Sequence, residues 1–262
     1  MKIAVCVKQI QDPEIATALF RVDEATNSVV PMAGLAPVIS PYDEQAIEAA
    51  LRIKDKKPDT KVVVITLGAA SAREVLKHGL SMGADEGVLL SGTEGKAVDG
   101  YVTASLLRDA IRKVGDVDLV LTGRQSADLD AGIVGCGLAE LLNIPAINFG
   151  KSVEIVEGNL IAERVLDNGS EKIEAKLPAL VAISNEIGPA RKPSLRETMR
   201  ASKKPVASWS QSDVSSENVE PKQDLVRLYV PKKEKHCEIL TGTDPGELAV
   251  NLVRKLRSAR LI

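Results

Sequence analysis

The stretch VDLVLTGRQSADLDAGIVGCGLAELL, from Val117 to Leu142, decides the fold of this chain. It begins with an apolar run that stops at Gly123, continues as a polar turn, and ends in a segment rich in small and apolar residues. This order predicts a buried parallel strand, a loop and a helix. Asp130 is well placed to cap that helix.

The junction between this strand and its helix suits a phosphate group. The first N–H groups of a helix have no intrahelical partner, and they lie at the positive end of its dipole. Gly132 and Gly135 carry no side chain, so a ligand or another backbone can come close. A helix packed tightly on the sheet without any ligand would use the same residues, and this stretch alone does not decide between the two.

The composition favours an α/β protein. The chain has 262 residues, of which 44% are hydrophobic but only 2% aromatic, so its core must consist of Ala, Val, Leu and Ile, as in parallel sheets covered by helices. A net charge of −2 provides no basic field for nucleic acid or for an anionic membrane surface.

The cysteines and the apolar runs bear on location. Cys6, Cys136 and Cys237 are far apart and form no CxxC motif, which predicts a reducing compartment without structural disulfides or a zinc site. No apolar run reaches the length of a signal segment or a membrane span. We therefore expect a cytoplasmic protein that does not insert into a membrane.

Strand and helix patterns alternate through the first half of the chain. Strands are predicted at 3–7, 61–68, 87–90, 117–123 and 143–147, and helices over 40–57, 71–82, 99–114 and after the turn that follows Gly123. Residues 20–30 predict a small hairpin, residues 151–176 antiparallel strands, and residues 178–184 a further buried strand. These patterns predict a Rossmann-like parallel sheet flanked by helices over residues 1–184, with a hairpin insertion near 151–176.

Residues 185–262 have a different character. Up to Pro221 they show no strong period and are rich in Pro, Ser, Lys and Arg, which predicts an extended arm with little core of its own. Asp244 to Arg260 begins with an acid and a proline and carries an apolar stripe. This predicts an amphipathic tail helix.

No catalytic set emerges from the sequence. His78 and His236 have no carboxylate or cysteine at metal or triad spacing and are expected on the surface. Cys6 and Cys136 fall within apolar runs and are expected to pack as small hydrophobic residues. The motifs GxxxxGK[ST], HExxH, GxSxG and GxGxxG are all missing.

What remains is a crevice at the carboxyl ends of the predicted strands, where open α/β sheets bind ligands. The first strands provide apolar walls for a flat base, and the turn after the strand at 117–123 provides N–H groups for a phosphate. An adenine mononucleotide fits both features. The predicted lining residues are Cys6, Lys8, Ser40, Ile65, Thr66, Leu67, Gly123, Arg124, Gln125, Asp128, Gly132, Ile133 and Val134.

Five segments, in order, resemble the β subunit of electron-transfer flavoprotein, and the resemblance covers nearly the whole chain. They are AVCVKQ at 4–9, SPYDEQAIEAA at 40–50, MGAD at 82–85, GRQSAD at 123–128 and LRETMRASKKP at 195–205. The family's diagnostic segment also resembles residues 162–178, except at Asn168, where an acid or glycine is usual.

The resemblance implies a heterodimer with an α subunit that holds a redox FAD, serving flavin dehydrogenases such as acyl-CoA dehydrogenase and an acceptor oxidoreductase. In most members the β subunit binds a structural AMP, whereas in electron-bifurcating members the same site holds a second FAD. By matching position, four residues would line the adenosine and three would donate backbone N–H groups to phosphate. They are Cys6, Ser40, Ile65 and Leu67 for the adenosine, and Gly132, Ile133 and Val134 for the phosphate.

Some positions depart from the family pattern. In the family, polar residues usually follow the turn that contains Asp128 and Asp130. Here residues 131–134 are Ala, Gly, Ile and Val, so a phosphate would be held by backbone groups alone. Asp128 and Asp130 would repel a phosphate and are assigned to capping or turn bonding. The Gly123-Arg124-Gln125 segment resembles bifurcating members and the 244–262 tail resembles the others, so AMP is our expectation and FAD remains the alternative.

Leu195 matches the anchor of the family's partner-recognition loop. Met199 and Arg200 follow it, and Arg200, Lys203 and Lys204 form a basic run just behind. An exposed leucine that enters a dehydrogenase pocket would make one residue decisive for docking. The alternative is that Leu195 packs against its own domain. The tail helix is expected to pack on the α subunit.

An enzyme of the adenine-nucleotide hydrolase type would share the crevice. Such an enzyme needs a phosphate loop after the first strand and a magnesium-binding acid near it. Residues 9–13, with the sequence QIQDP, do not form such a loop. The electron-carrier reading therefore explains the sequence better.

Overall fold

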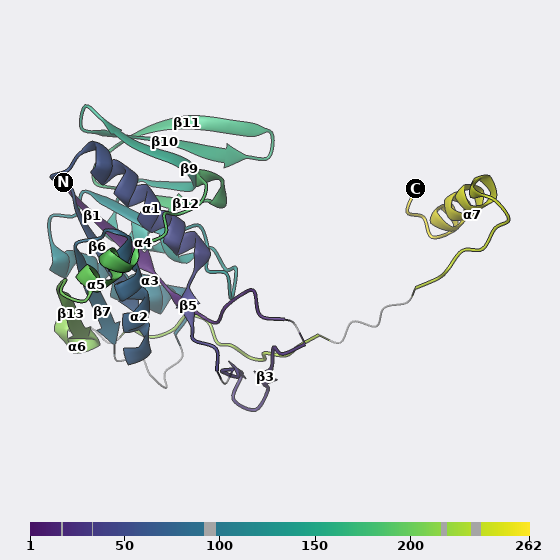
Figure 1. Cartoon of the computed structure of the whole chain (residues 1–262), viewed down its shortest axis with the longest axis horizontal. Coiled ribbons are helices and arrows are strands. Elements are labelled where there is room, and N and C mark those ends of the chain that lie inside the picture. Colours follow the sequence, from purple (N-terminus) through teal and green to yellow (C-terminus); the bar gives the residue numbers. More distant parts are fainter. Residues whose placement is uncertain (17, 33, 92–97, 216–218, 232–236) are drawn as a thin grey trace. The chain divides into compact units, whose positions relative to one another are not determined.

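A computed structural model of the chain describes residues 1–16, 18–32, 34–91, 98–215, 219–231 and 237–262. Its centre is a nine-stranded sheet (Figure 1). The strands lie in the order β11 (Gly169–Lys176), β10 (Asn159–Leu166), β9 (Ala146–Val156), β12 (Ala179–Ile183), β8 (Leu119–Gly123), β1 (Lys2–Val7), β6 (Lys61–Leu67), β7 (Glu86–Ser91) and β13 (Val206–Ser210).

All neighbouring strands from β9 to β13 in this order are parallel, whereas β10 and β11 are antiparallel to their neighbours. The central strands β12, β8, β1 and β6 are buried on both faces and consist largely of Val, Ile, Leu and Ala, as the low aromatic content predicts. The five parallel strands predicted in the first half and the returning strand at 178–184 are confirmed.

Helices cover both faces of the sheet. Residues of α1 (Pro41–Lys56) and α2 (Arg73–Met82) belong to one buried cluster, and residues of α3 (Gly100–Val114) and α4 (Val134–Leu142) belong to the other. Local signals place their starts: α1 follows Ser40 with proline at its first position, and the Asp99 side chain accepts the N–H of Val102 to cap α3. The predicted α/β class is confirmed.

An excursion leaves the sheet between β1 and α1. Within it, β3 (Val22–Asp23) and β4 (Ser28–Val29) form the predicted small hairpin. Two further short strands, β2 (Gln9–Ile10) and β5 (Val38–Ile39), pair with each other and return the chain to the end of β1. The excursion therefore begins and ends at the carboxyl edge of the sheet.

Three predicted elements differ in the structure. The strand predicted at 143–147 and the first antiparallel strand are one continuous strand, β9, which contains a bulge where Phe149 has φ +57°. The helix after β8, α4, begins only at Val134. Its N-cap is Ile133, so capping by Asp130 is wrong; Asp130 itself has φ +51° and lies in the preceding loop.

The division of the chain falls later than residue 184. Residues 1–228 form one compact unit, because β13 adds the edge strand beside β7 and α5 (Leu195–Ala201) packs against α2. A 3-10 turn at Asn185–Ile187 and the short helix α6 (Gln211–Val214) also belong to this unit. The loop-like composition of residues 185–215 hid these elements.

Residues 229–262 form the second unit, which contains α7 (Pro245–Ser258). Asp244 caps α7 by accepting the N–H of Glu247 at 3.0 Å, as the acid and proline predict. No residue of α7 is buried, and Val250 and Leu252 are about half exposed. Among the described residues, no helix is long and apolar enough to cross a membrane.

Replacing Gly123 should destabilise the fold. A Cβ at this position would lie 2.5 Å from Asp43 Oδ1 and 2.9 Å from the backbone carbon of Tyr42. We expect Gly123→Ala to lower the free energy of unfolding by about 1–3 kcal/mol, the usual range for overpacking.

Gly137→Ala is the matched control in chemical denaturation. At Gly137, in α4, an added Cβ would only touch Ala104 at 3.6 Å. Alanine there should leave stability unchanged or raise it by up to about 1 kcal/mol. Equal effects of the two substitutions would contradict the close approach of α1 to the end of β8.

Candidate nucleotide-binding site

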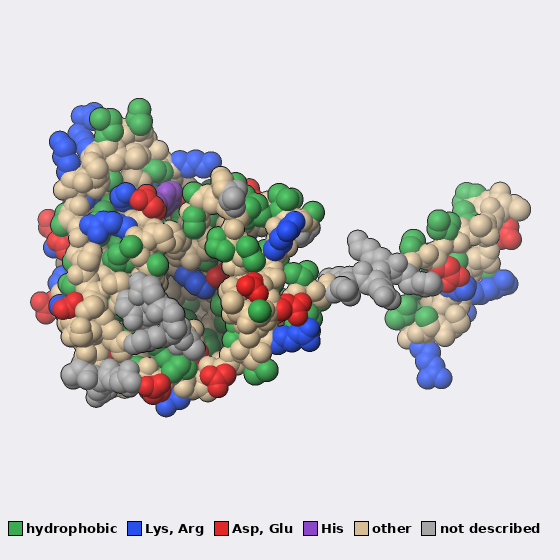
Figure 2. All heavy atoms as spheres, turned by 90° about the horizontal axis from the view of Figure 1, so that it is seen from below, with side chains coloured by type: hydrophobic (Ala, Val, Ile, Leu, Met, Phe, Trp, Pro, Cys, Tyr) green, Lys and Arg blue, Asp and Glu red, His purple; other side chains and the backbone are tan. Residues whose placement is uncertain are grey.

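The candidate site lies where the order of strands reverses. From β1 the chain runs outward through β6 and β7, and it then returns across the sheet to β8 on the other side of β1. At such a switch point the two neighbouring connections leave on opposite faces and open a crevice beyond the carboxyl ends of the strands. The ends of β1 and β8 border this crevice, as the sequence predicts. Viewed from below, the face of the molecule at this side is hollowed (Figure 2).

Asp43 joins the three elements that meet at the crevice. It lies in the first turn of α1, and its Oδ2 accepts the backbone N–H of Lys8 at 2.8 Å, just past β1. Its Oδ1 accepts the backbone N–H of Gly123 at 3.0 Å, at the end of β8. The sequence suggested only an acid facing the helix dipole. One available signal was missed: Asp43 falls on the apolar stripe of α1 with Ile47 and Ala50.

Burial raises the pKa values of two side chains at the crevice, Asp43 and Cys6. It raises the pKa of Asp43 to about 7, against the opposing effect of the N–H groups of Lys8 and Gly123 and of the Lys8 charge. Burial, together with the nearby Asp43 carboxylate, also raises the pKa of the Cys6 thiol to about 12. Cys6 is therefore neutral and buried, as predicted for a small residue within an apolar run. Cys136 is exposed, next to Asn148, so the prediction that it packs as a core residue is wrong.

The loop before α4 presents free backbone donors. Gly132 has φ +64°, a conformation that favours glycine. The N–H groups of Gly132, Ile133 and Val134 donate no hydrogen bond within the described chain, in keeping with a helix start that lacks a side-chain cap. Gln125 Nε2 donates to Asp130 Oδ1 at 2.7 Å, so the acid serves the turn, one of the two roles predicted for it.

A charge pair spans the crevice. Lys8 Nζ, past the end of β1, donates to both carboxylate oxygens of Asp128 at 2.9 and 2.7 Å. Partial burial favours the neutral acid, but hydrogen bonds from Lys8 and Ser126 prevail and lower the pKa of Asp128. Asp128 is thus ionised and balanced, and its charge is directed at Lys8 rather than at a ligand.

Arg124 forms part of the rim. Its backbone N–H continues the ladder to Ile183, and its guanidinium lies 5.0 Å from the ring centre of Tyr42 and 5.8 Å from that of Phe149. Nη2 lies 3.3 Å from the Tyr42 hydroxyl, and Nε is buried without a partner among the described residues. Neither Tyr42 nor Phe149 was predicted at this rim. Phe149 has φ +57° within a strand, and a positive φ there leaves no signal in the sequence.

The remaining lining residues are brought together by the sheet register. Cys6 is paired with Ile65 on the neighbouring strands, and Ser40 N–H donates to the Lys8 carbonyl at 3.0 Å. Cys6, Ile65 and Leu67 face the α3–α4 layer. Thr66 alternates with Ile65 and Leu67 along β6, so its side chain faces the α1–α2 layer. Only the backbone of Thr66 is near the side of the sheet that Cys6 and Ile65 face.

Unused polar atoms at the crevice fit a nucleotide. Ser40 is fully buried, yet its Oγ has no hydrogen-bond partner and does not cap α1. Buried hydroxyls normally have partners, so this orphaned donor is consistent with a ligand that carries polar edges. The fit of the residues to an adenylate group therefore rests on Ser40 Oγ and on the free N–H groups of residues 132–134.

The predicted recognition residues lie on α5, away from the crevice. Leu195 is 79% exposed and Met199 67%, one turn apart on the same helix, and Arg200 is also exposed. The alternative that Leu195 packs against its own domain is therefore wrong. Lys204 is not part of the exposed basic run, because its Nζ donates to the carbonyls of Leu80 and Ala84 at 2.9 and 2.5 Å.

The histidines do not form a catalytic centre in the described part of the chain. His78 is partly exposed, and its Nε2 lies 2.6 Å from Glu44 Oε1 on α1, a neighbour that sequence spacing did not indicate. His236 lies outside the described residues. Among the residues that the structure describes, no group of His, Cys, Asp and Glu could hold a metal ion.

Comparison with known proteins identifies the family. The model of the electron transfer flavoprotein domain matches residues 29–214. The chain therefore belongs to the electron transfer flavoprotein family.

Several of its relatives are named as electron transfer flavoprotein subunit beta. It is 36% identical to the electron transfer flavoprotein subunit beta of Thermoanaerobacterium thermosaccharolyticum and 35% identical to the caffeyl-CoA reductase-Etf complex subunit CarD of Acetobacterium woodii, with both chains fully covered in each case. It is 31% identical to the protein FixA of Azorhizobium caulinodans over 84% of this chain and 78% of that one. The electron-transfer function and the need for an α-type partner follow from this membership.

Asp43 should make stability depend on pH. Its carboxyl has a pKa of about 7 in the folded chain against an ordinary value of 3.8, so between these values the folded state binds more protons than the unfolded state. The contribution of Asp43 to the free energy of unfolding should therefore decrease as the pH rises from about 4 to about 7.

Asp43→Asn should remove this part of the pH dependence. We expect the stability difference between wild type and variant, measured by denaturant titration, to fall steadily across that interval. Asp59→Asn is the control, because Asp59 is an exposed carboxylate. A wild-type-minus-variant difference that is constant from pH 4 to 7 would contradict the assignment.

Proposed function

We propose that this chain is the β subunit of a heterodimeric electron-transfer flavoprotein. With an FAD-bearing α subunit it would accept electrons from flavin dehydrogenases, such as acyl-CoA dehydrogenases, and pass them to an acceptor oxidoreductase in the cytoplasm. The family membership supports this role. The chain itself contributes a nucleotide site and docking surfaces.

In this proposal the crevice binds the adenylate part of a nucleotide, and AMP is the preferred occupant. Its main support is that free N–H groups at residues 132–134 and the orphaned Ser40 Oγ occur at the same sheet edge, beside the strand-order reversal. The base would lie against Cys6, Ile65 and Leu67, and the phosphate would accept the backbone N–H groups at the start of α4. AMP bound in this way would hold the two halves of the sheet edge together.

A second FAD in the same crevice is the alternative, as in electron-bifurcating members of the family. The full-length relative CarD, whose name places it in a reductase-Etf complex, favours this reading. Arg124 favours it as well, because a guanidinium at the rim suits the second phosphate of a dinucleotide. The adenylate half would bind as AMP does, so the two occupants differ only in what extends toward Arg124.

The nucleotide content of the purified heterodimer distinguishes the two. We expect denaturation to release one FAD and one AMP per heterodimer, quantified by chromatography with absorbance detection. Two FAD and no AMP would establish the alternative. Release of one FAD and no other nucleotide would contradict adenylate binding by this chain.

Leu195 and Met199 are the proposed contact with the dehydrogenase. Both side chains lie on α5, exposed to solvent, and Lys192, Arg196 and Arg200 around them are exposed as well. A partner pocket that is apolar at its centre and acidic at its rim would match this surface. For α7 the proposed partner is the α subunit, because its apolar side chains are uncovered within its own unit.

Leu195→Ala should slow electron acceptance without affecting assembly. Loss of a buried leucine contact costs about 1.5–3 kcal/mol, roughly a 10- to 100-fold decrease in kcat/KM for the reduced dehydrogenase. Nucleotide content and binding of the α subunit should be unchanged.

Leu166→Ala provides the control for exposed leucines. Leu166 is 44% exposed at the tip of the β10–β11 hairpin, far along the sheet from α5. Stopped-flow reduction of the heterodimer by dehydrogenase should be unaffected by this substitution. If Leu195→Ala also leaves the kinetics unchanged, Leu195 is not the docking anchor.

A further inference from the structure

The recognition helix α5 is short, yet both of its flanks are tied to the body of the protein. The helix has seven residues, and only Ala201 is buried. Ser194 and Glu197 form a capping box at its start. A helix of this length does not hold its position in water without tertiary contacts, so its packing against α2 and the contacts of its flanks together fix its place.

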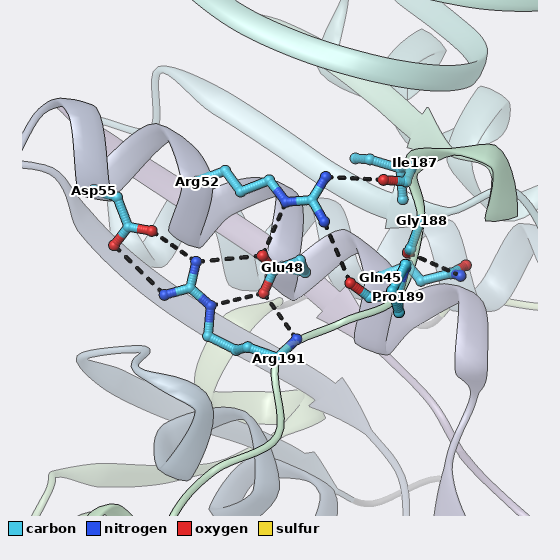
Figure 3. Close-up of polar contacts among 8 residues, drawn as sticks. All are labelled: Gln45, Glu48, Arg52, Asp55, Ile187, Gly188, Pro189 and Arg191. Carbon is cyan, nitrogen blue, oxygen red and sulfur yellow. Dashed lines mark hydrogen bonds and ion pairs between the residues drawn. The ribbon is translucent and has the colours of Figure 1, made fainter.

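The first tie joins the segment before α5 to α1 (Figure 3). Arg191 donates from Nε to Glu48 Oε2 at 2.7 Å and from Nη2 to Asp55 Oδ2 at 2.7 Å. Its backbone N–H also donates to Glu48 Oε2, at 3.1 Å. Hydrogen bonds from both Arg191 and Arg52 outweigh burial and lower the pKa of Glu48, so the acid is ionised.

Arg52 extends this tie along the preceding turn. Its Nε donates to Glu48 Oε1 at 2.9 Å, and its two terminal nitrogens donate to the carbonyls of Ile187 and Pro189 at 2.8 and 3.3 Å. The Glu48 side chain is only 7% exposed, so the charge-assisted bonds around it are partly shielded from water. Three residues, 192–194, separate the fixed Arg191 from Leu195.

The second tie lies on the other side of α5. Lys204 Nζ donates to the carbonyls of Leu80 and Ala84, at the carboxyl end of α2. A cation at this position satisfies carbonyls that the helix leaves unpaired and complements its dipole. After Lys204 the chain enters β13 and the central sheet. Leu195 and Met199 are thus held between an anchor on α1 and an anchor on α2.

We propose that Glu48, Arg191 and Lys204 are positioning residues that hold α5 in the arrangement required for docking to the dehydrogenase. They touch neither the nucleotide crevice nor, in this proposal, the partner. This inference rests on the proposed docking role of Leu195. Because the ties fix the helix before the encounter, the partner does not have to order it, which lowers the cost of binding.

The test compares two arginine substitutions in the complete heterodimer. Arg191→Met removes the guanidinium but keeps much of the side-chain length. Arg108→Met is the matched control, because Arg108 also pairs with a carboxylate, that of Asp109 at 2.8 Å, but lies on α3 over the opposite face of the sheet. Arg191→Lys keeps the charge and loses the paired geometry, so it should give an intermediate result.

The first measurement is backbone hydrogen exchange of residues 194–201. We expect faster exchange in Arg191→Met than in wild type and wild-type exchange in Arg108→Met. The second measurement is steady-state kinetics with a reduced acyl-CoA dehydrogenase from the same organism. If the docking arrangement is populated about a tenth of the time without the tie, KM rises about tenfold while kcat stays near wild type.

The outcomes separate this inference from the docking role itself. If Leu195→Ala raises KM but Arg191→Met changes neither exchange nor KM, the positioning role is overturned and the docking role stands. If neither substitution raises KM, the docking role fails and the positioning role fails with it, whatever the exchange shows. If Arg191→Met and Arg108→Met lower kcat equally and leave KM unchanged, both substitutions cause a general loss of structure. This outcome would also overturn the proposal.

Discussion

The acceptance of two backbone N–H groups by the buried Asp43 carboxylate is the constraint on which the rest of the structure depends. The donors, Lys8 and Gly123, belong to the ends of β1 and β8, the strands between which the strand order reverses. A carboxylate in this place sets how far the two strand ends lie from the start of α1 and excludes any side chain at position 123. The ends of β1 and β8 and the start of α1, which border the crevice, are therefore held in place without a ligand.

Helix α1 makes contacts at both of its ends that fix other parts of the molecule. Its first turn meets the crevice through Asp43, and its later turns hold the segment before α5 through Glu48, Arg52 and Asp55. One helix thus connects the proposed nucleotide site with the proposed docking surface. A carrier that must bind a cofactor on one side and meet a partner on another benefits from such a fixed spacing.

Much of the fold could be predicted from the sequence because its signals are local. Apolar runs such as 62–65 and 119–121, bounded by turn residues, are typical of buried strands, and Ser40-Pro41 marked the start of α1. The features that were missed depend on tertiary contacts. β13 contains Ser, Trp and Ala and becomes a strand only beside β7, whereas the late start of α4 reflects a loop shaped by Asp130 and Gly132 at positive φ.

In the candidate site, too, features with local signals could be predicted, whereas features that depend on tertiary contacts could not. The glycine turn and the apolar strand ends led to the proposed nucleotide site, and the resemblance to a family led to Leu195 as the proposed docking residue. Asp43 had the sequence context of an ordinary first-turn acid, so its contact with two distant strands could not be recognised, and neither could the ties of Arg191 and Lys204. Contacts between residues far apart in the chain require the fold to be known.

A crystal structure of the heterodimer purified with its native nucleotide tests the central claim most directly. We expect an adenylate phosphate within hydrogen-bond distance of the backbone N–H groups of residues 132–134, with Asp43 still accepting from Lys8 and Gly123. A crevice filled by protein side chains, or a nucleotide phosphate bound elsewhere on this chain, would contradict it.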